Sequence, residues 1–197
     1  MMSSTKGILA FAFSAAAALV LAWQPGEGIQ TDFPQDQWPQ IRREMSEARL
    51  SHAKVEFSKR SRAYDFSGEI QTPFYRGADF VQKHLDKLDS LTYDEVMAKA
   101  NPEVVGVVLE TQHMNRAEAE AVQVALKVDG RTVQPFRDQL NSCILKVVGY
   151  YGERRFVANR SFYFESKDLK GAKSLEVLIF EGEAKVHAIE VPVRKLQ

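Results

Sequence analysis

Residues 143–164 read CILKVVGYYGERRFVANRSFYF, and this stretch contributes most to the fold prediction. Two apolar and aromatic runs, Cys143 to Tyr151 and Phe156 to Phe164, stand on either side of the polar residues Gly152 to Arg155. Aromatic and β-branched residues are enriched in strands, and glycine with charged residues between two such runs is typical of a turn. The stretch therefore predicts two aromatic strands that meet at a turn.

Similar short runs occur on both sides of this pair, at a spacing of roughly ten residues. Asp129 and Gly130 form a turn pattern between two of them. The further runs are Val104 to Thr111, Ala121 to Val128, Arg131 to Val133, Ser174 to Phe180 and Ala184 to Val193. About seven short strands at this spacing are typical of a sandwich. We therefore predict an antiparallel β-sandwich over residues 103–197.

Residues 39–101 predict helices packed against that sandwich. A first helix of about four turns is indicated by apolar or semi-apolar positions at steps of three and four, namely Ile41, Met45, Ala48, His52 and Val55. A second helix is indicated by the same spacing of Ala78, Val81, Leu85 and Leu88. A third begins at Thr92, which forms a capping box with Glu95, and ends at Asn101 and Pro102.

The strand spacing resembles that of immunoglobulin-like and fibronectin-type-III-like domains. The resemblance covers the strand rhythm alone, because the paired cysteines of true immunoglobulin domains are missing and both tryptophans, Trp23 and Trp38, precede the strand region. The predicted fold class is therefore α+β, with N-terminal helices on a C-terminal antiparallel β-sandwich of this type. Such folds host many unrelated functions, so no activity follows from the fold.

Residues 1–22 have the pattern of a secretory signal peptide. Lys6 precedes an uncharged apolar run over residues 7–22, which at 16 residues is short of the roughly 20 that a membrane span needs. We expect cleavage after Ala22, and an uncleaved N-terminal anchor is the alternative. Residues 23–38 are rich in proline and glycine and predict a linker. The protein is thus expected to be extracytoplasmic, periplasmic or secreted, and to touch a membrane only if that segment stays uncleaved.

The composition argues against several kinds of site. Lysine and arginine total 26, as do aspartate and glutamate, so no nucleic-acid partner is expected. Cys143 is the single cysteine, which excludes a disulfide within the chain. Glu110 and His113 form one Glu-x-x-His tetrapeptide, but diiron bundles need that motif twice on helices. We predict no metal and no cofactor, and no motif names a catalytic residue.

These observations favour a non-enzymatic binding protein or a cell-envelope-associated module, with a protein or envelope partner. The alternative is an extracytoplasmic hydrolase whose site is assembled only in the fold, and a third hypothesis is a structural spacer. A pocket that holds two carboxylates, or a carboxylate with a histidine, would favour the hydrolase. A flat apolar patch would favour binding.

Tyr151, Arg154 and Arg155, at the turn between the two aromatic strands, are the candidate interaction residues. Tyrosine and arginine are enriched at binding hot spots because they combine a large contact area with hydrogen-bonding capacity. The alternative is an ordinary hairpin in which Tyr150, Tyr151 and Phe156 pair across the strands and the arginines are solvated. The sequence leaves both interpretations open.

Overall fold

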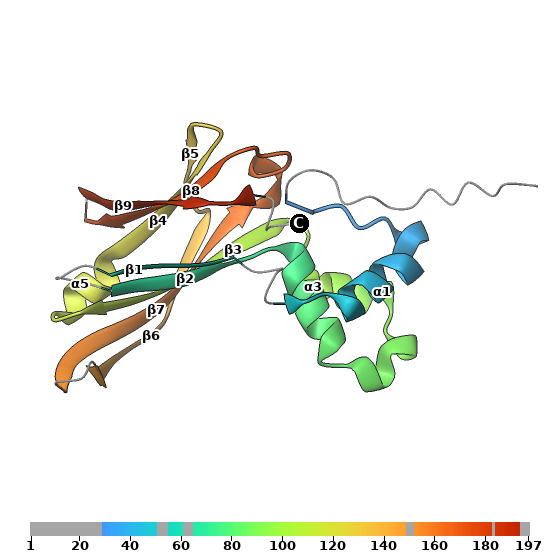
Figure 1. Cartoon of the computed structure of the whole chain (residues 1–197), viewed down its shortest axis with the longest axis horizontal. Helices are drawn as coiled ribbons and strands as arrows, with labels where there is room; N and C mark the ends of the chain where they lie inside the picture. The colour runs from blue at the N-terminus through green and yellow to red at the C-terminus, as the bar shows by residue number, and fades with distance from the viewer. Residues whose placement is uncertain (1–28, 51–54, 61–64, 149–151, 183, 194–197) are drawn as a thin grey trace, which may run out of the picture.

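The computed structural model describes residues 29–50, 55–60, 65–148, 152–182 and 184–193, so the predicted export segment lies outside the described residues. The chain has an α+β fold with two antiparallel sheets, and most of its helices gather at one end of them (Figure 1). The five-stranded sheet has the order β1 (Val55–Arg60), β2 (Asp65–Gln71), β3 (Val104–His113), β7 (Glu153–Glu165), β6 (Arg137–Val148). The four-stranded sheet has the order β5 (Arg131–Val133), β4 (Val122–Val128), β8 (Leu175–Glu181), β9 (Ala184–Val191).

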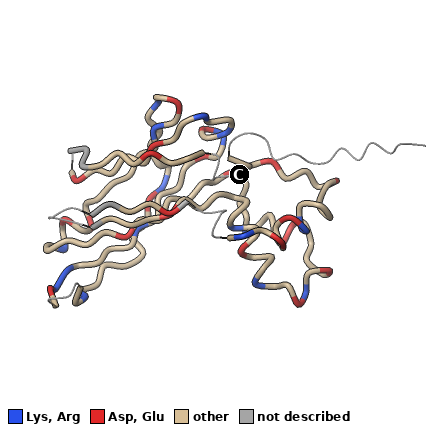
Figure 2. The backbone as a smooth tube through the Cα atoms, in the orientation of Figure 1, with Lys and Arg blue, Asp and Glu red and all other residues tan. Residues whose placement is uncertain are grey.

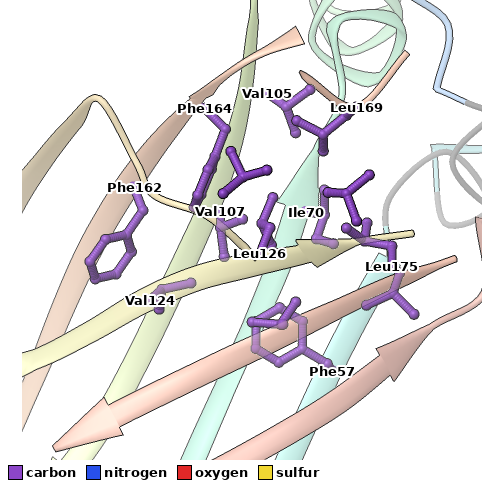
Figure 3. Close-up of a cluster of buried hydrophobic side chains, with 14 of the residues drawn as sticks. Phe57, Ile70, Val105, Val107, Val124, Leu126, Phe162, Phe164, Leu169 and Leu175 are labelled. Carbon is purple, nitrogen blue, oxygen red and sulfur yellow. The ribbon is translucent and has the colours of Figure 1, made fainter. Parts of the chain in front are cut away.

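The main core takes side chains from both sheets (Figure 3). Along β3 the alternate residues Val105, Val107 and Leu109 are fully buried, because a strand with one covered face buries every second side chain. Phe162 and Phe164 of β7 are buried in the same cluster. The four-stranded sheet contributes Val122, Val124, Leu126, Val128, Val133, Leu175, Val177, Ile179 and Val191. No residue of β6 belongs to this described cluster, although β6 lies beside β7.

The helical part has a core of its own. It contains the α-helices α1 (Trp38–Glu47), α3 (Pro73–Gln82) and α4 (Tyr93–Ala100), together with the 3-10 helices η1 (Gln35–Gln37) and η2 (Leu85–Ser90). Ile41, Met45 and Val81 are fully buried in this second cluster. A Cβ at Gly77 would lie 2.7 Å from the Met45 methyl carbon, so glycine permits the close approach of α3 to α1. None of the described helices is long and apolar enough to cross a membrane.

Local capping explains where two of these helices begin. The Thr92 hydroxyl accepts the Glu95 amide at 3.3 Å, and the Thr92 amide donates to the Glu95 carboxylate at 2.8 Å. This confirms the predicted capping box at the start of α4. Helix α3 begins in a similar way, since the Thr72 hydroxyl accepts the Tyr75 amide at 3.1 Å and Pro73 occupies the first helical position.

Arg76 of α3 joins the helical part to the five-stranded sheet. Its guanidinium donates to the carbonyls of Gln71 at 2.9 Å, Ala100 at 3.0 Å and Asn101 at 3.1 Å, and also to that of Val104. Burial lowers the pKa of Arg76 to about 10. One side chain therefore satisfies carbonyls at the end of α4, at the end of β2 and at the start of β3.

The region predicted to be helical, residues 39–101, requires a correction. The first helix ends at Glu47 rather than near Val55, and β1 and β2 form an antiparallel hairpin within that range. Phe57 of β1 is buried in the core between the sheets, and in β2 Phe66 and Ile70 are buried there while Ser67 and Glu69 are not, so β2 follows the two-residue period of a strand. The three-and-four spacing that reached Val55 relied on Ala48 and His52, which are weak apolar markers. In addition, Leu85 is more than half exposed and does not continue the buried stripe of α3.

Part of the predicted linker is packed against the folded chain. Ile29 is 4% exposed and belongs to the core between the sheets, and Phe33 is 5% exposed and belongs to the helical core. Tyr93 fixes this segment by donating its hydroxyl to the Phe33 carbonyl at 2.7 Å. Composition predicted a linker because proline and glycine are frequent there, but the two apolar residues find buried positions.

Candidate functional site

Strand β6 forms one edge of the five-stranded sheet and is exposed along almost its whole length. All of its 12 residues are exposed except Cys143 and Val148, which are partly buried. Four large apolar side chains are among the exposed ones, from Leu140 at 40% to Val147 at 68%. We call the β6 edge surface the group Arg137, Leu140, Ile144, Leu145, Lys146, Val147 and, from β7, Arg154.

The exposure of β6 follows from what covers each part of the sheet. Helix α5 (Arg116–Ala121) lies against β3, β7 and β6, and Arg160 of β7 donates to the Glu120 carbonyl at the end of that helix. Beyond α5, β6 and β7 extend away from the four-stranded sheet (Figure 1). Leu145 and Val147 lie on the same face of the sheet as the core residue Phe162. They are more than half exposed, because the second sheet does not extend over them. The opposite edge strand, β1, instead lies next to β9 of the four-stranded sheet.

The β6 edge surface also carries unbalanced positive charge. Arg155 pairs with Glu153 at 2.8 Å, and Arg160 pairs with Asp138. Within β6 and β7, three further cations, Arg137, Lys146 and Arg154, form no ion pair with a described carboxylate. Basic residues lie beside acidic ones at the free end of the β6–β7 hairpin (Figure 2). This edge therefore has a local excess of cations on a chain whose formal net charge is zero.

The predicted interaction residues lie at this end of the hairpin. Arg154 is exposed, whereas Arg155 is partly buried and held by Glu153, and Tyr151 lies outside the described residues. Their role as contact residues stays a prediction. Sequence reasoning missed the apolar part of the surface, residues 144–147. The available indication was that Ile144 and Leu145 are consecutive, so two faces of one strand carry large apolar side chains.

The structure places a histidine and a carboxylate together elsewhere, at the end of β3. The Nδ1 atom of His113 lies 3.6 Å from a carboxylate oxygen of Glu181, which is longer than a hydrogen bond. The ring of Phe66 makes edge-to-face contacts with two imidazoles, and the distances between ring centres are 5.9 Å to His113 and 5.2 Å to His187. Burial lowers the pKa of His113 and raises the pKa of Glu181, because burial disfavours the charged form of each group.

This cluster does not have the geometry of an accessible catalytic pair. His113 is 1% exposed, which leaves no surface for a substrate to approach. Glu110 lies on the other face of β3, since its register partner is Asn159 whereas that of His113 is Phe156. The Glu-x-x-His tetrapeptide therefore directs its two side chains to opposite sides of the sheet. Within the described ranges, no three histidine, cysteine, aspartate or glutamate side chains are grouped as a metal would require.

Two hollows open on the described surface. One, of about 600 Å³, lies on the outer face of the five-stranded sheet and includes Glu56, Glu69 and Glu110. The other, of about 800 Å³, lies between the N-terminal segment and the strand ends, where Lys170 pairs with Asp32 at 2.5 Å. No histidine is among the described residues that line either hollow. The first hollow thus brings carboxylates together without an imidazole.

The chain matches no protein-family model, and none of the curated proteins matches it. The candidate site therefore rests on the geometry of the described residues. The combination that stands out is an edge strand with exposed apolar side chains and unpaired cations. Exposed edge strands and exposed apolar patches are features on which other chains can pack, although β6 also carries Lys146 and a bulge, which limit unspecific edge pairing in soluble proteins.

Proposed function

We propose that this protein is an exported, non-enzymatic binding module, secreted or associated with the cell envelope, whose contact surface is the β6 edge surface. The immunoglobulin-like β-sandwich predicted from strand spacing is the scaffold in this proposal. Support for export comes from Lys6 and the apolar run over residues 7–22. Support for binding comes from the β6 edge surface.

The observation that carries the proposal is the exposure of β6 at the edge of its sheet. An edge strand leaves every second N–H and C=O group without a strand partner, and another chain can pair with them. Leu145 and Val147 are each more than half exposed. Fully burying an exposed side chain of this size is worth about 1.5–3 kcal/mol, so a partner that covers the exposed part of both side chains gains roughly half of that from each.

Crosslinking in the source cell tests the proposal. A photoreactive residue replaces Val147, and a matched one replaces Thr132, which is exposed on the edge strand β5 of the other sheet. We expect Val147 to give a discrete adduct, identified by mass spectrometry, that is lost when Leu145→Ser is added. Absence of any adduct at Val147, or an equal adduct at Thr132, would contradict the proposed surface.

Fractionation and N-terminal sequencing test the other half of the proposal. We expect the chain outside the cytoplasm, beginning at Trp23 if the segment is cleaved. A chain that keeps Met1 in the cytoplasmic fraction would show that the export prediction is wrong. A chain that keeps Met1 in the membrane fraction would instead support the anchored form.

An extracytoplasmic hydrolase remains the alternative, and the outer-face hollow favours it. Glu56 and Glu69 are register partners on β1 and β2, and Glu110 lines the same hollow from β3. Carboxylate pairs serve as acid and base in glycosidases. If this hollow is catalytic, hydrolysis of an oligosaccharide panel should depend on Glu110, so that Glu110→Gln lowers the rate while Glu103→Gln, a carboxylate outside the hollow, leaves it unchanged.

A further inference from the structure

We propose that the β6 edge surface binds an extended segment of a partner protein by strand addition, and that this segment alternates acidic with apolar side chains. This inference rests on the proposed function and names the chemistry of its partner. It follows from the register of β6, from the two faces that the register defines and from the charges left unpaired there.

The register shows which part of β6 can accept a strand. Ser142 to Val148 pairs with β7 without interruption, whereas a bulge lies between Leu140 and Ser142. A strand rises about 3.3 Å per residue, so an uninterrupted segment of this kind is roughly 20 Å long. An extended partner of about seven residues can therefore pair along it, as peptides do at exposed sheet edges in β-augmentation.

The two faces of this segment carry different side chains, although the outer face also has one apolar residue, Ile144, whose register partner is Val157. Leu145 and Val147 have Phe156 and Arg154 as register partners and lie on the inner face. Lys146 has Arg155 as its partner and lies on the outer face, so two cations are neighbours there. An added strand alternates its side chains between the same two faces. Apolar residues of the partner would cover Leu145 and Val147, and the residues between them would face Lys146.

Charge complementarity makes those intervening residues acidic. Asp138 and Glu153 are already paired with Arg160 and Arg155, so Lys146 has no carboxylate in the described part of the chain. Arg154 also forms no ion pair with a described carboxylate, but it shares the inner face with its register partner Val147, so the residues opposite Lys146 do not face it. A partner with acidic residues supplies the missing charges, and opposite charge across an interface also favours association and selects among partners.

A second copy of the chain fits this edge less well. In a symmetric antiparallel pair, Lys146 would find a carboxylate only by facing Asp138 of the other copy. The bulge prevents this, because Asp138 shares a face with Phe162 whereas Lys146 shares a face with Arg155, on the other side of the sheet. Asp138 is also held by Arg160. A second copy would therefore leave Lys146 without a carboxylate, so it complements the charge of this edge less well than an acidic segment does.

Peptide binding tests the inference on the purified full chain. The probes are two fluorescent ten-residue peptides with blocked ends, one alternating glutamate with valine and the other alternating lysine with valine. We expect fluorescence anisotropy to show that the acidic peptide binds at least about tenfold more tightly. The difference should shrink as salt is added, since the cations are exposed. Equal affinity for the two peptides would overturn the inference.

A charge reversal provides the matched variants. The double substitution Lys146→Glu with Arg154→Glu should invert the preference, so that the basic peptide binds more tightly. The control, Lys99→Glu with Lys173→Glu, changes two exposed lysines outside the β6 edge surface by the same total charge and should keep the acidic preference. Thermal melts confirm that each variant is folded. If the two double variants change the peptide preference equally, the effect comes from net charge, and the proposed binding site is wrong.

Backbone methylation distinguishes strand addition from charge attraction alone. In the acidic peptide, N-methylation of one set of alternate residues removes the N–H groups that pair with β6, and methylation of the other set does not. Methylation of the first set should abolish binding, and methylation of the second set should leave the affinity nearly unchanged. Equal loss from both sets would contradict strand addition.

The outcomes also separate this inference from the proposed function. If neither peptide binds and the Val147 adduct persists in cells, the acidic partner is wrong and the contact surface stands. If the adduct is also missing, the proposed function fails as well. A doubled molecular mass in solution, with Leu145→Ser restoring the single mass, would show that a second copy occupies the edge and would overturn the inference.

Discussion

Strands β7 and β6 lie side by side in one sheet and have 13 and 12 residues, yet their environments are opposite. Phe162 and Phe164 of β7 are buried in the core, whereas Leu145 and Val147 of β6 are more than half exposed. Both strands are rich in apolar residues. The difference shows that hydrogen bonding places a strand in a sheet, while the layer above it decides which side chains are buried.

The same contrast holds between two register partners. Val157 of β7 is 3% exposed and Ile144 of β6 is 50% exposed, although they pair across the two strands. A central strand has neighbours on both sides, and an edge strand has a neighbour on one side alone. We infer that β7 contributes to the stability of the fold and that β6 is free to serve a contact.

The largest expected effect lies in β7. Phe164→Ala should lower the free energy of unfolding by about 3–5 kcal/mol, because it removes a fully buried ring and leaves a cavity between the sheets. Urea unfolding at constant pH measures the change. A loss below about 1 kcal/mol would show that β7 is no better packed than β6, and the comparison would fail.

Arg76 should give the next largest effect, at the end of the sheet opposite the hairpin. Arg76→Met keeps much of the apolar stem but leaves the carbonyls of Gln71, Ala100 and Val104 without this donor. Leaving buried polar groups unpaired costs about 1–3 kcal/mol. Arg76→Lys should recover part of the loss, since an ammonium reaches fewer carbonyls than the guanidinium fork. Equal unfolding midpoints for Arg76→Met and the unaltered chain would show that the hydrogen bonds of Arg76 do not stabilise the fold.

The dependence of the unfolding free energy on pH tests the burial of His113 and Glu181, the cluster at the end of β3. Burial lowers the pKa of His113, and Arg155 acts in the same direction while Glu118 opposes it. Below about pH 6.5 His113 is protonated in the unfolded chain but has a lower affinity for the proton in the folded chain. The free energy of unfolding therefore falls as the pH falls. His113→Gln should remove this decline. The measurement is the difference in unfolding free energy between variant and parent from pH 7 to pH 5.

Glu181 provides the control of opposite sign. Burial raises its pKa, with the Glu118 carboxylate adding to the effect, so the folded chain keeps a proton that the unfolded chain has released. This contribution to stability is present below the ordinary pKa of a glutamate, about 4.5, and is lost as the pH rises. Glu181→Gln should therefore stabilise the protein relative to the parent as the pH increases. The same sign for both variants would contradict the assigned burial.

Helix starts and most strands could be predicted from the local sequence pattern. The burial of each strand could not, because it depends on which layer of the fold covers that strand. The capping residues Thr92 and Glu95 predicted the start of α4, and the short run Val104 to Thr111 predicted β3. The β1–β2 hairpin was missed because Ala48, His52 and Val55 happened to match a helical spacing. The exposed edge was missed because a consecutive apolar run such as Ile144 and Leu145 reads as a buried strand. Arg154 could be named from composition, but its unpaired charge is visible only once its neighbours are placed.

The smallest expected effect compares the two register partners directly. Val157→Ala should cost about 1–3 kcal/mol, and Ile144→Ala should stay within about 0.5 kcal/mol, because the Ile144 side chain already contacts water in the folded state. Urea unfolding at several protein concentrations measures both. If Ile144→Ala costs as much as Val157→Ala, and if that cost disappears on dilution, a second copy covers β6 in solution. Self-association makes the stability depend on protein concentration, whereas a partner that is missing from the purified sample cannot affect it. A concentration-dependent cost would therefore show that a second copy, and not an acidic partner segment, occupies the β6 edge surface.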